Sequence, residues 1–440
     1  MSMIGTAFLV GHVLFGAGTG TPPAPFGVYD AWIESPGGRI PFILEVRPRL
    51  EFDAADPTGA VPTDAELGAF VVAIQNGDER VTVTSAAMLG ETLVLRFDPY
   101  EAELHASPGT ESGTLEGRWI RRRGKQQFVA MPFGGGPVAP EPLHRPDPVS
   151  IEHRWRMEFA PVEPAPALKP ESSGPAPIES PDVGLVRVRA DGRATGTILS
   201  TTGDARYLHG TFDGTTLELA SFSGSGASLY RAVYTPASDG SPATLTGERW
   251  SGSTSHRRFK GVADSGVALP DDMAITRAIA RPDLDALRFI DERGNTVALS
   301  ALIDGPAILQ IFGTWCPNSN DAAALMDELH AICEAQGVDL VALAFESDGE
   351  FATDSVRIAQ FRARHGVRYP ILFAGESDKA KARARLPFLD RVHSYPSILF
   401  LNAAGDVSAI HTGYCGPATG AEHARMVDRI LGAVLDIVPE

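Results

Sequence analysis

At 440 residues, of which 43% are hydrophobic and 21% charged, the chain has a globular composition but is too long for one ordinary core. At roughly 100 to 200 residues per domain it should form two to four domains, and we expect three. The 38 basic and 55 acidic side chains leave a net charge of −17, which argues against nucleic acid or an anionic membrane surface as a partner.

The first 24 residues allow two interpretations. An apolar run at residues 4–15, followed by small residues, suggests a signal peptide, although no Lys or Arg precedes it. A signal peptide would direct the protein to the periplasm or cell envelope, whereas an ordinary disordered start would leave it in the cytoplasm. No run in the sequence reaches the roughly 18 to 20 apolar residues that cross a bilayer, so we expect no transmembrane span.

Residues 26–264 have the pattern of an all-β region. Short segments in which apolar and polar residues alternate are separated by turns rich in Gly, Asp and Asn. One example is the strand-like segment 70–74, which is followed by a turn at residues 76–78 and a second strand-like segment at residues 81–84.

An internal repeat divides this region into two parts. Four segments recur in the same order, offset by 124 to 130 positions: residues 77–80 and 203–206, 93–97 and 217–222, 102–106 and 227–232, and 114–119 and 244–250. The first pair shares the turn sequence Gly-Asp-x-Arg. The simplest interpretation is two similar β modules, each a small barrel or sandwich.

We place module 1 at residues 25–135 and module 2 at residues 149–268. The stretch 134–148 is rich in Gly and Pro and is the expected linker between the modules. The Pro-rich stretch 160–181 follows a strand-like segment and is interpreted as a long mobile loop inside module 2. The modules are candidates for binding a ligand, which the sequence does not identify.

From Leu287 the pattern changes to strands that alternate with helices. The expected strands lie at residues 287–290, 297–299, 307–312, 340–345, 371–373, 398–401 and 407–410, and the expected helices at residues 318–335, 353–365, 378–386 and 421–438. This alternation implies a third domain, at residues 285–440, with a central sheet and helices on both faces.

All three cysteines, Cys316, Cys333 and Cys415, lie in this third domain, so the first 300 residues hold no disulfide framework. Cys316 falls where a buried strand ends and a helix begins. Unpaired N–H groups and the helix dipole favour an anion there, so we expect a thiol pKa below the usual value of about 8.5 and a nucleophilic thiolate. Cys333 follows Leu329 by one helical turn, which suits a small buried side chain.

The Trp-Cys-Pro motif at residues 315–317, the Tyr-Pro step at residues 395–396 and Gly413 resemble the active-site helix, cis-proline and groove glycine of thioredoxin-like proteins. Within these proteins the chain most resembles the TlpA/ResA-like thiol-disulfide oxidoreductases of bacterial envelopes, over residues 287–438. The resemblance implies a multidomain protein with a C-terminal thioredoxin-like fold, protein or low-molecular-weight thiols and disulfides as substrates, and no metal or organic cofactor. It also implies a substrate groove shaped by Trp315, Pro317, Tyr395, Pro396 and Gly413.

The family usually carries a second Cys three residues after the first, and this chain has Ser319 there instead. Ser319 can donate a hydrogen bond to the Cys316 thiolate, but it cannot resolve a mixed disulfide, so turnover needs an outside thiol or another Cys. Cys415 is the candidate resolving group, because the segment after Gly413 lies near the groove in this fold. The alternative for Cys415 is a small side chain in a surface loop.

Glu346, at the end of an apolar strand, resembles the acid below the thiols of this family, where a partly buried carboxylate exchanges protons with the thiol. The alternative is a solvated acid at a strand end. Two functions remain: a thiol-disulfide oxidoreductase with Cys316, Ser319 and Glu346 as catalytic residues, or a degenerate thioredoxin scaffold of the envelope that holds partner peptides. The retained Cys316 favours the first function, and Ser319 favours the second.

Overall fold

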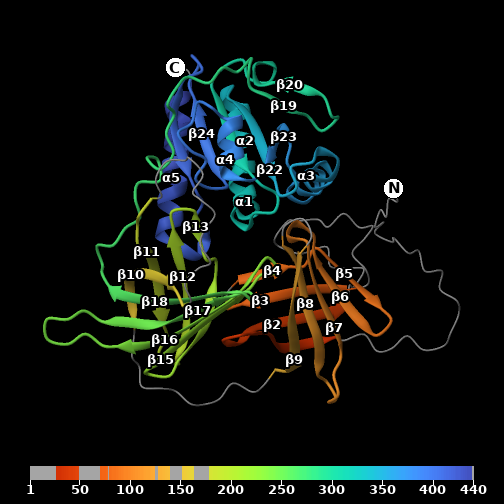
Figure 1. Ribbon diagram of the computed structural model, residues 1–440, viewed down its shortest axis with the longest axis vertical. Coiled ribbons are helices and arrows are strands. Elements are labelled where there is room, and N and C mark those ends of the chain that lie inside the picture. The colour runs from red at the N-terminus through yellow and green to blue at the C-terminus, as the bar shows by residue number, and fades with distance from the viewer. Residues whose placement is uncertain are drawn as a thin grey trace, which may run out of the picture.

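The described residues form two antiparallel sheets of nine strands each and one mixed sheet of seven strands with helices (Figure 1). The two β modules lie side by side, and the C-terminal domain stands above both, with α1 at the end nearest to them. The segment interpreted as a signal peptide and most of the two Pro-rich stretches lie outside the described residues. The computed structural model describes residues 26–48, 70–77, 79–123, 127–138, 151–162 and 178–438.

Module 1 is an open sheet with the strand order β4-β3-β2-β1-β9-β8-β7-β6-β5. Side chains alternate between core and surface along its strands, as in β7, where Ala102, Leu104 and Ala106 are buried and the residues between them are half-buried. The elements are β1 Gly27–Ser35, β2 Gly38–Pro48, β3 Phe70–Asn76, β4 Glu79–Thr82, β5 Ser85–Leu89, β6 Thr92–Phe97, the 3-10 helix η1 Asp98–Tyr100, β7 Ala102–Pro108, β8 Leu115–Arg123 and β9 Gln127–Pro137.

Module 2 closes into a barrel. β11 pairs with both β10 and β12, so eight strands form a ring, and β13 extends this ring beside β12. Of the barrel and the sandwich that the sequence left open for each module, module 2 is therefore a barrel. The strands are β10 Glu152–Pro161, β11 Asp182–Val188, β12 Arg193–Ser200, β13 Gly203–Asp204, β14 Leu208–Phe212, β15 Thr216–Phe222, β16 Ala227–Thr235, β17 Thr244–Ser251 and β18 Ser255–Ala263.

The two modules have the same strand order. The series β3-β2-β1-β9-β8-β7-β6-β5 in module 1 corresponds to β12-β11-β10-β18-β17-β16-β15-β14 in module 2. Three of the repeated sequence segments fall on the equivalent strand pairs β6 and β15, β7 and β16, and β8 and β17. The sequence repeat thus corresponds to a repeated topology. Among the described residues, hydrogen bonds close this topology into a ring in module 2 and not in module 1.

Phe222, at the end of β15 in module 2, fills the open side of module 1. Its ring centroid lies 4.6 Å from that of Phe42 and 5.6 Å from that of Trp119. Asn76 of module 1 holds the backbone of Phe222, because its amide donates to Phe222 O at 3.1 Å and accepts from Phe222 N at 3.1 Å. The two modules therefore share one hydrophobic core.

The C-terminal domain has the sheet order β20-β19-β23-β22-β21-β24-β25, in which β21, β22 and β23 are parallel. Helices α2, α3 and α5 pack on one face and α4 on the other, as the alternation predicted. The elements are β19 Arg288–Ile290, β20 Thr296–Ala298, η2 Leu299–Ala301, β21 Ala307–Phe312, α1 Pro317–Asp321, α2 Ala323–Gln336, β22 Asp339–Glu346, α3 Phe351–His365, β23 Ile371–Glu376, α4 Lys379–Arg385, β24 Ser397–Leu401, β25 Val407–Thr412, η3 Pro417–Thr419 and α5 Ala421–Ile437.

Two elements differ from the sequence prediction. The helix expected at residues 318–335 is divided into α1 and α2 at Ala322, whose ψ of −13° departs from that of a regular α-helix while the residue stays in the right-handed helical region. Strand β9 continues to Pro137, past the end expected for module 1. Its glycines are part of the sheet, because they pair with β1. At Gly134 a side chain would not fit, since a Cβ there would lie 2.4 Å from the indole of Trp32.

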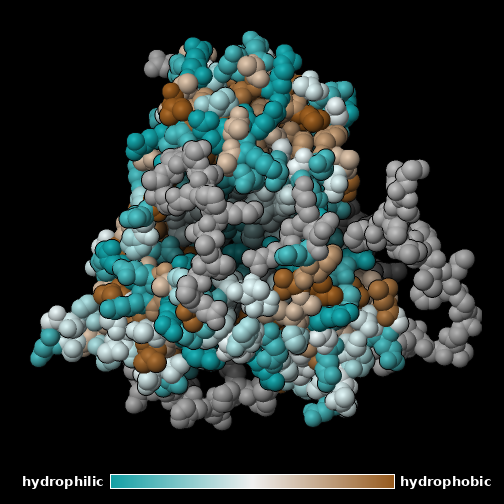
Figure 2. Space-filling view, viewed as in Figure 1, coloured by the Kyte–Doolittle hydropathy of each residue, from teal (hydrophilic) through white to brown (hydrophobic). Residues whose placement is uncertain are grey.

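On the face of the molecule shown in Figure 2, apolar residues form small separate patches among polar ones. Large exposed hydrophobic residues such as Leu89, Phe128 and Ile279 belong to different parts of the chain. In the part of the chain that the structure describes, no helix is long and apolar enough to cross a membrane.

Candidate active site

Cys316 lies between β21 and α1. It immediately precedes α1, and Pro317 is the first helical residue, a position where the missing N–H removes no helical hydrogen bond. The Cys316 residue is 8% exposed, and its Sγ donates a hydrogen bond to the Tyr395 carbonyl oxygen at 3.2 Å. The peptide bond between Tyr395 and Pro396 is cis, as predicted. The thiol is therefore in contact with the cis-proline loop.

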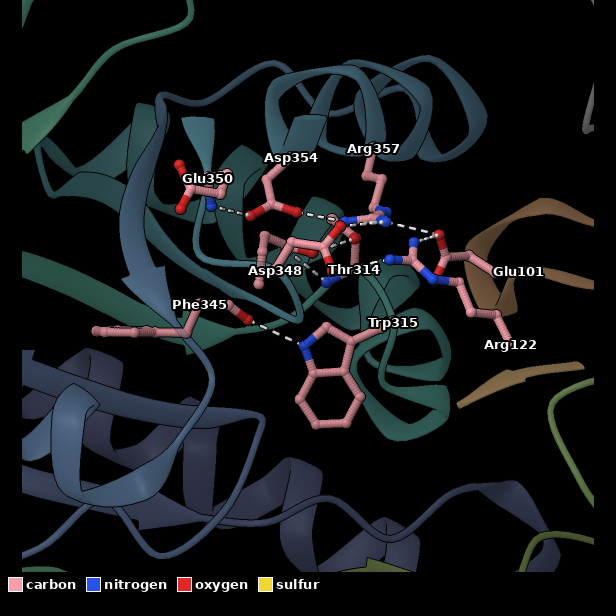
Figure 3. A network of polar contacts seen from close by, with 10 residues as sticks. Glu101, Arg122, Thr314, Trp315, Phe345, Asp348, Glu350, Asp354 and Arg357 are labelled. Carbon is pink, nitrogen blue, oxygen red and sulfur yellow. Dashed lines mark hydrogen bonds and ion pairs between the residues drawn. The ribbon is translucent and has the colours of Figure 1, made fainter. Parts of the chain in front are cut away.

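Two aromatic side chains are fixed beside the thiol. Trp315 is half-buried, and its Nε1 donates to Phe345 O at 3.0 Å (Figure 3). The rings of Trp315 and Tyr395 meet edge to face at 5.8 Å, and the Tyr395 hydroxyl donates to Ser377 O at 3.0 Å. These bonds hold both rings in place next to Cys316.

The pKa of the Cys316 thiol is shifted in the direction opposite to the prediction. Burial raises this pKa, and the effect exceeds the lowering by hydrogen bonds from the backbone and hydroxyl of Ser319 and from the backbone of Asn318. The prediction of a lowered pKa is therefore wrong, because it considered the helix start and not the loss of water around a covered thiol. Ser319 itself has no exposed surface.

Glu346, the last residue of β22, is fully buried and bonded to Thr314. Its carboxylate accepts hydrogen bonds from Thr314 N at 2.9 Å and from Thr314 Oγ1 at 2.7 Å. Burial raises the pKa of Glu346 to about 8, against the lowering by these two hydrogen bonds. Since Thr314 is two residues before Cys316, Glu346 supports the loop that carries the thiol.

A charged network next to Glu346 joins the C-terminal domain to module 1 (Figure 3). Arg357 on α3 pairs with Asp354, with Asp348 at 3.0 Å and with Glu101 of module 1 at 2.6 Å. Arg122 of module 1 pairs with Glu101 at 2.7 Å and with Asp348 at 3.3 Å. Sequence reasoning missed this network, because its members come from three distant segments that share no motif.

Asn320 on α1 and His365 on α3 also hold the loop that carries the thiol, and sequence reasoning missed both. Asn320 Nδ2 donates to the backbone oxygens of Thr314 at 2.8 Å and Cys316 at 2.9 Å. The Asn320 Oδ1 then accepts from His365 Nε2 at 3.1 Å. Burial and the charge of Arg364 lower the pKa of His365 to about 4, so this imidazole is neutral at pH 7.

Gly413 and Cys415 follow β25 and have different surroundings. Gly413 N donates to Pro396 O at 3.0 Å, so this glycine lies at the cis-proline loop as expected. The Cys415 Sγ lies 3.7 Å from Met426 Sδ, and burial raises the pKa of Cys415 to about 12. Among the described residues, no contact joins Cys415 to Cys316. The third cysteine, Cys333, is buried on the core side of α2, as predicted.

A cavity of about 390 Å³ lies where module 1, module 2 and the C-terminal domain meet. Tyr100 and Trp119 of module 1, Ser251 of module 2, and Trp315 beside the thiol belong to its wall. Within the described residues, no group of three or more His, Cys, Asp and Glu side chains is placed to hold a metal ion.

No family model matches the chain. The chain is similar to the thiol-disulfide oxidoreductase ResA of Halalkalibacterium halodurans, with 25% identity over 141 residues, which are 31% of this chain and 72% of that protein. A secreted Mycobacterium tuberculosis disulfide oxidoreductase homologous to E. coli DsbE matches at 18% identity and a TM-score of 0.25, over 32% of this chain and 94% of that one. A putative thiol:disulfide interchange protein DsbE from Chlorobium tepidum matches at 18% identity and a TM-score of 0.28, over 36% of this chain and 99% of that one.

These matches cover about a third of the chain and leave the rest unmatched. The C-terminal domain contains the features of the resemblance: the three parallel strands flanked by helices, Cys316 at the start of α1, and the cis-Pro396 loop in contact with the thiol. The C-terminal third of the chain is therefore a TlpA/ResA-like thioredoxin-fold domain.

Proposed function

We propose that this protein is a thiol-disulfide oxidoreductase that acts through one cysteine, Cys316. The observation that carries the proposal is the hydrogen bond of 3.2 Å from Cys316 Sγ to the carbonyl of Tyr395, directly before cis-Pro396, with the thiol at the start of α1. The similarity to a relative named as a thiol-disulfide oxidoreductase supports the same chemistry. The proposed substrates are protein or low-molecular-weight disulfides.

The reaction begins when Cys316 loses its proton and the thiolate attacks one sulfur of a substrate disulfide. A bond forms between Cys316 and that sulfur, the substrate S–S bond breaks, and the other sulfur leaves as a thiolate that takes up a proton. Because Ser319 has no sulfur, an outside thiol then attacks the mixed disulfide. The outside thiol forms a new disulfide with the substrate sulfur that was bonded to Cys316, and Cys316 leaves as a thiolate and recovers its proton. The net result is that the outside thiol has replaced one of the two thiols of the substrate disulfide.

Other residues of the site have proposed supporting roles. Ser319 stabilises the Cys316 thiolate by hydrogen bonds, and Glu346 takes or releases a proton near neutral pH next to Thr314. An outside thiol is the preferred resolving group, because the Cys415 thiol faces Met426. The residues proposed to contact the substrate are Trp315, Pro317, Tyr395, Pro396 and Gly413.

An envelope location is part of the proposal and is supported by the apolar run at residues 4–15. Fractionation of cells that express the full chain tests the location. Recovery in the cytoplasmic fraction would leave the thiol chemistry intact and remove the envelope assignment.

The burial of Cys316, its raised pKa and the Ser319 substitution favour a second candidate function, a thioredoxin scaffold without catalysis. The two functions differ in what happens when a disulfide is offered. An oxidoreductase forms a mixed disulfide at Cys316, and a scaffold does not.

The test measures mixed-disulfide formation with oxidised glutathione, cysteine by cysteine, by peptide mass spectrometry over about pH 6 to 10. We expect one glutathione at Cys316, released again by reduced glutathione, and no exchange in Cys316→Ser. Cys333→Ser is the matched control, since Cys333 is buried in the core away from the site. If Cys316 stays unmodified in the wild type and also in Gly203→Ala, the variant designed below to uncover this thiol, the oxidoreductase is rejected and the scaffold function is supported.

A further inference from the structure

A turn of module 2 lies directly on the Cys316 site. Residues 201–202 join β12 to the short strand β13, and these two residues together with β13 are here called the 201–204 turn. Its Thr202 carbonyl accepts hydrogen bonds from Ser394 Oγ at 2.8 Å and from Asn318 Nδ2 at 3.4 Å. Ser394 is next to the tyrosine that accepts the thiol hydrogen bond, and Asn318 is the second residue of α1. The turn therefore contacts both sides of the site.

Two glycines allow this close approach. A Cβ on Gly413 would lie 3.3 Å from the Thr202 carbonyl carbon. A Cβ on Gly203, whose φ is +146°, would lie 1.8 Å from Asn318 Nδ2 and 2.9 Å from Tyr414 O. A side chain at Gly203 would therefore separate the turn from the site, and one at Gly413 would crowd it.

Further contacts anchor the chain behind the turn. Asp204 Oδ2 accepts a hydrogen bond from Gly416 N at 2.6 Å. Arg206 pairs with Asp321 on α1 at 2.9 Å and with Glu79 of module 1 at 3.1 Å. Because the Arg206 side chain is only 18% exposed and joins three parts of the molecule, it holds the C-terminal end of the turn in position.

We propose that the 201–204 turn is an intramolecular plug, and that disulfide substrates reach Cys316 only after the turn has left the site. The proposal rests on the function proposed above. A peptide substrate needs main-chain hydrogen bonds with the surface around the thiol. The Thr202 carbonyl already takes the donors of Ser394 and Asn318, so the plug and a substrate compete for the same place.

The test compares Gly203→Ala with Gly214→Ala in the full chain. The new methyl group of Gly203→Ala meets Asn318 and the Tyr414 backbone, so this variant should displace the turn. Gly214, with φ of +99°, lies in another turn of module 2 with nothing within 4 Å of its Cβ position, so Gly214→Ala adds backbone strain without touching the site. The readouts are hydrogen exchange of the turn, iodoacetamide alkylation of Cys316, and mixed-disulfide formation with oxidised glutathione.

We expect faster hydrogen exchange of the turn in Gly203→Ala and alkylation of Cys316 faster by about tenfold or more, with Gly214→Ala like the wild type. An open turn with unchanged alkylation would overturn the plug. Unchanged hydrogen exchange in both Gly203→Ala and Arg206→Ala would also overturn it, because the contact then never opens.

The two proposals fail in different ways. Faster alkylation of Cys316 without mixed-disulfide formation would support the plug and reject the oxidoreductase. Mixed-disulfide formation that is equally fast in the wild type and in Gly203→Ala would support the oxidoreductase and reject the plug.

Discussion

Cys316 immediately precedes a helix of only five residues, and Ser319 lies within this helix. The hydroxyl and backbone N–H of Ser319 both favour the thiolate, while the burial of Cys316 opposes it more strongly. The hydroxyl can take over the hydrogen bond that a second cysteine would offer to the thiolate. It cannot supply the second sulfur, so the fate of a mixed disulfide depends on a thiol from outside the site.

Ser319→Ala removes the hydroxyl hydrogen bond and keeps the backbone one. A hydrogen bond worth about 1 kcal/mol corresponds to roughly a fivefold change in an equilibrium, so alkylation of Cys316 near pH 8 should slow by about fivefold. The wild type, alkylated in parallel under the same conditions, is the reference for this rate. Faster alkylation in the variant would show that Ser319 chiefly shields the thiol.

Glu346 makes the stability of the C-terminal domain depend on pH above neutrality. Its pKa is about 8 in the folded protein, against 4.5 for an ordinary Glu. A raised folded pKa gives stabilisation that is complete below about pH 4.5 and is lost as the pH rises through about 8. The free energy of unfolding should therefore fall by about 1.4 kcal/mol between pH 7 and 9.

Urea unfolding at a series of pH values measures this fall. Glu346→Gln has nearly the same shape and stays neutral, so its unfolding free energy should not show the Glu346 contribution. Parallel curves for the wild type and Glu346→Gln between pH 7 and 9 would contradict the raised pKa.

The repeated Gly-Asp-x-Arg turn is used twice to join neighbouring parts of the molecule. In module 1, a Cβ on Gly77 would lie 3.1 Å from the Cβ of His209, so this turn packs on module 2. In module 2, the equivalent turn packs on the C-terminal domain through Gly203. Arg206 joins the two copies, because it pairs with Glu79. Each copy of the turn thus contacts the next part of the chain.

Only part of this arrangement could be predicted from the sequence. The repeat and the order of strands and helices follow from local patterns with a fixed period. The contacts of Thr202 with Ser394 and of Arg206 with Asp321 join distant segments, and no local pattern indicates them. Burial likewise depends on packing between distant segments, so reasoning from the position of Cys316 at a helix start gave the wrong direction for its pKa.

Arg357 connects α3 to module 1 through its pair with Glu101. Arg357→Ala should leave the fully buried Asp354 without its cation and the buried Asp348 with Arg122 alone. Loss of one partner of a buried ion pair costs roughly 3 to 5 kcal/mol, so the unfolding free energy should fall by about that amount.

The control for this change is Arg368→Ala, just beyond α3. Arg368 pairs with Asp327 at 3.5 Å, and its side chain is 56% exposed. Exposed pairs contribute about 0 to 1 kcal/mol, so urea unfolding should shift far less than in Arg357→Ala. Equal shifts in the two variants would mean that the network at Arg357 is solvated and weak.

In the whole molecule, module 1, module 2 and the C-terminal domain each contact the other two. Phe222 joins the two modules, the pair of Glu101 and Arg357 joins module 1 to the C-terminal domain, and the 201–204 turn joins module 2 to that domain. The end of the C-terminal domain that carries α1 is also the end that faces the modules (Figure 1). With the 201–204 turn as the plug proposed above, access to Cys316 should depend on how firmly the β modules hold together.

Phe222→Ala tests this coupling. Truncation of a buried Phe costs roughly 3 to 5 kcal/mol, and the cavity here would open in the core of module 1 although the residue belongs to module 2. Hydrogen exchange should therefore become faster in β2 and β8 of module 1 as well as in β15. Phe128→Ala, at a residue that is 68% exposed on β9, should leave exchange unchanged.

Loss of protection confined to module 2 would show that the modules fold independently and that the shared core does not couple them. Loss in both modules, together with faster alkylation of Cys316, would show that the 201–204 turn depends on the joined modules. The second outcome is expected, because Arg206 behind the turn is held by Glu79 of module 1 as well as by Asp321 of α1. A module 1 weakened by the missing ring would loosen one of these two anchors.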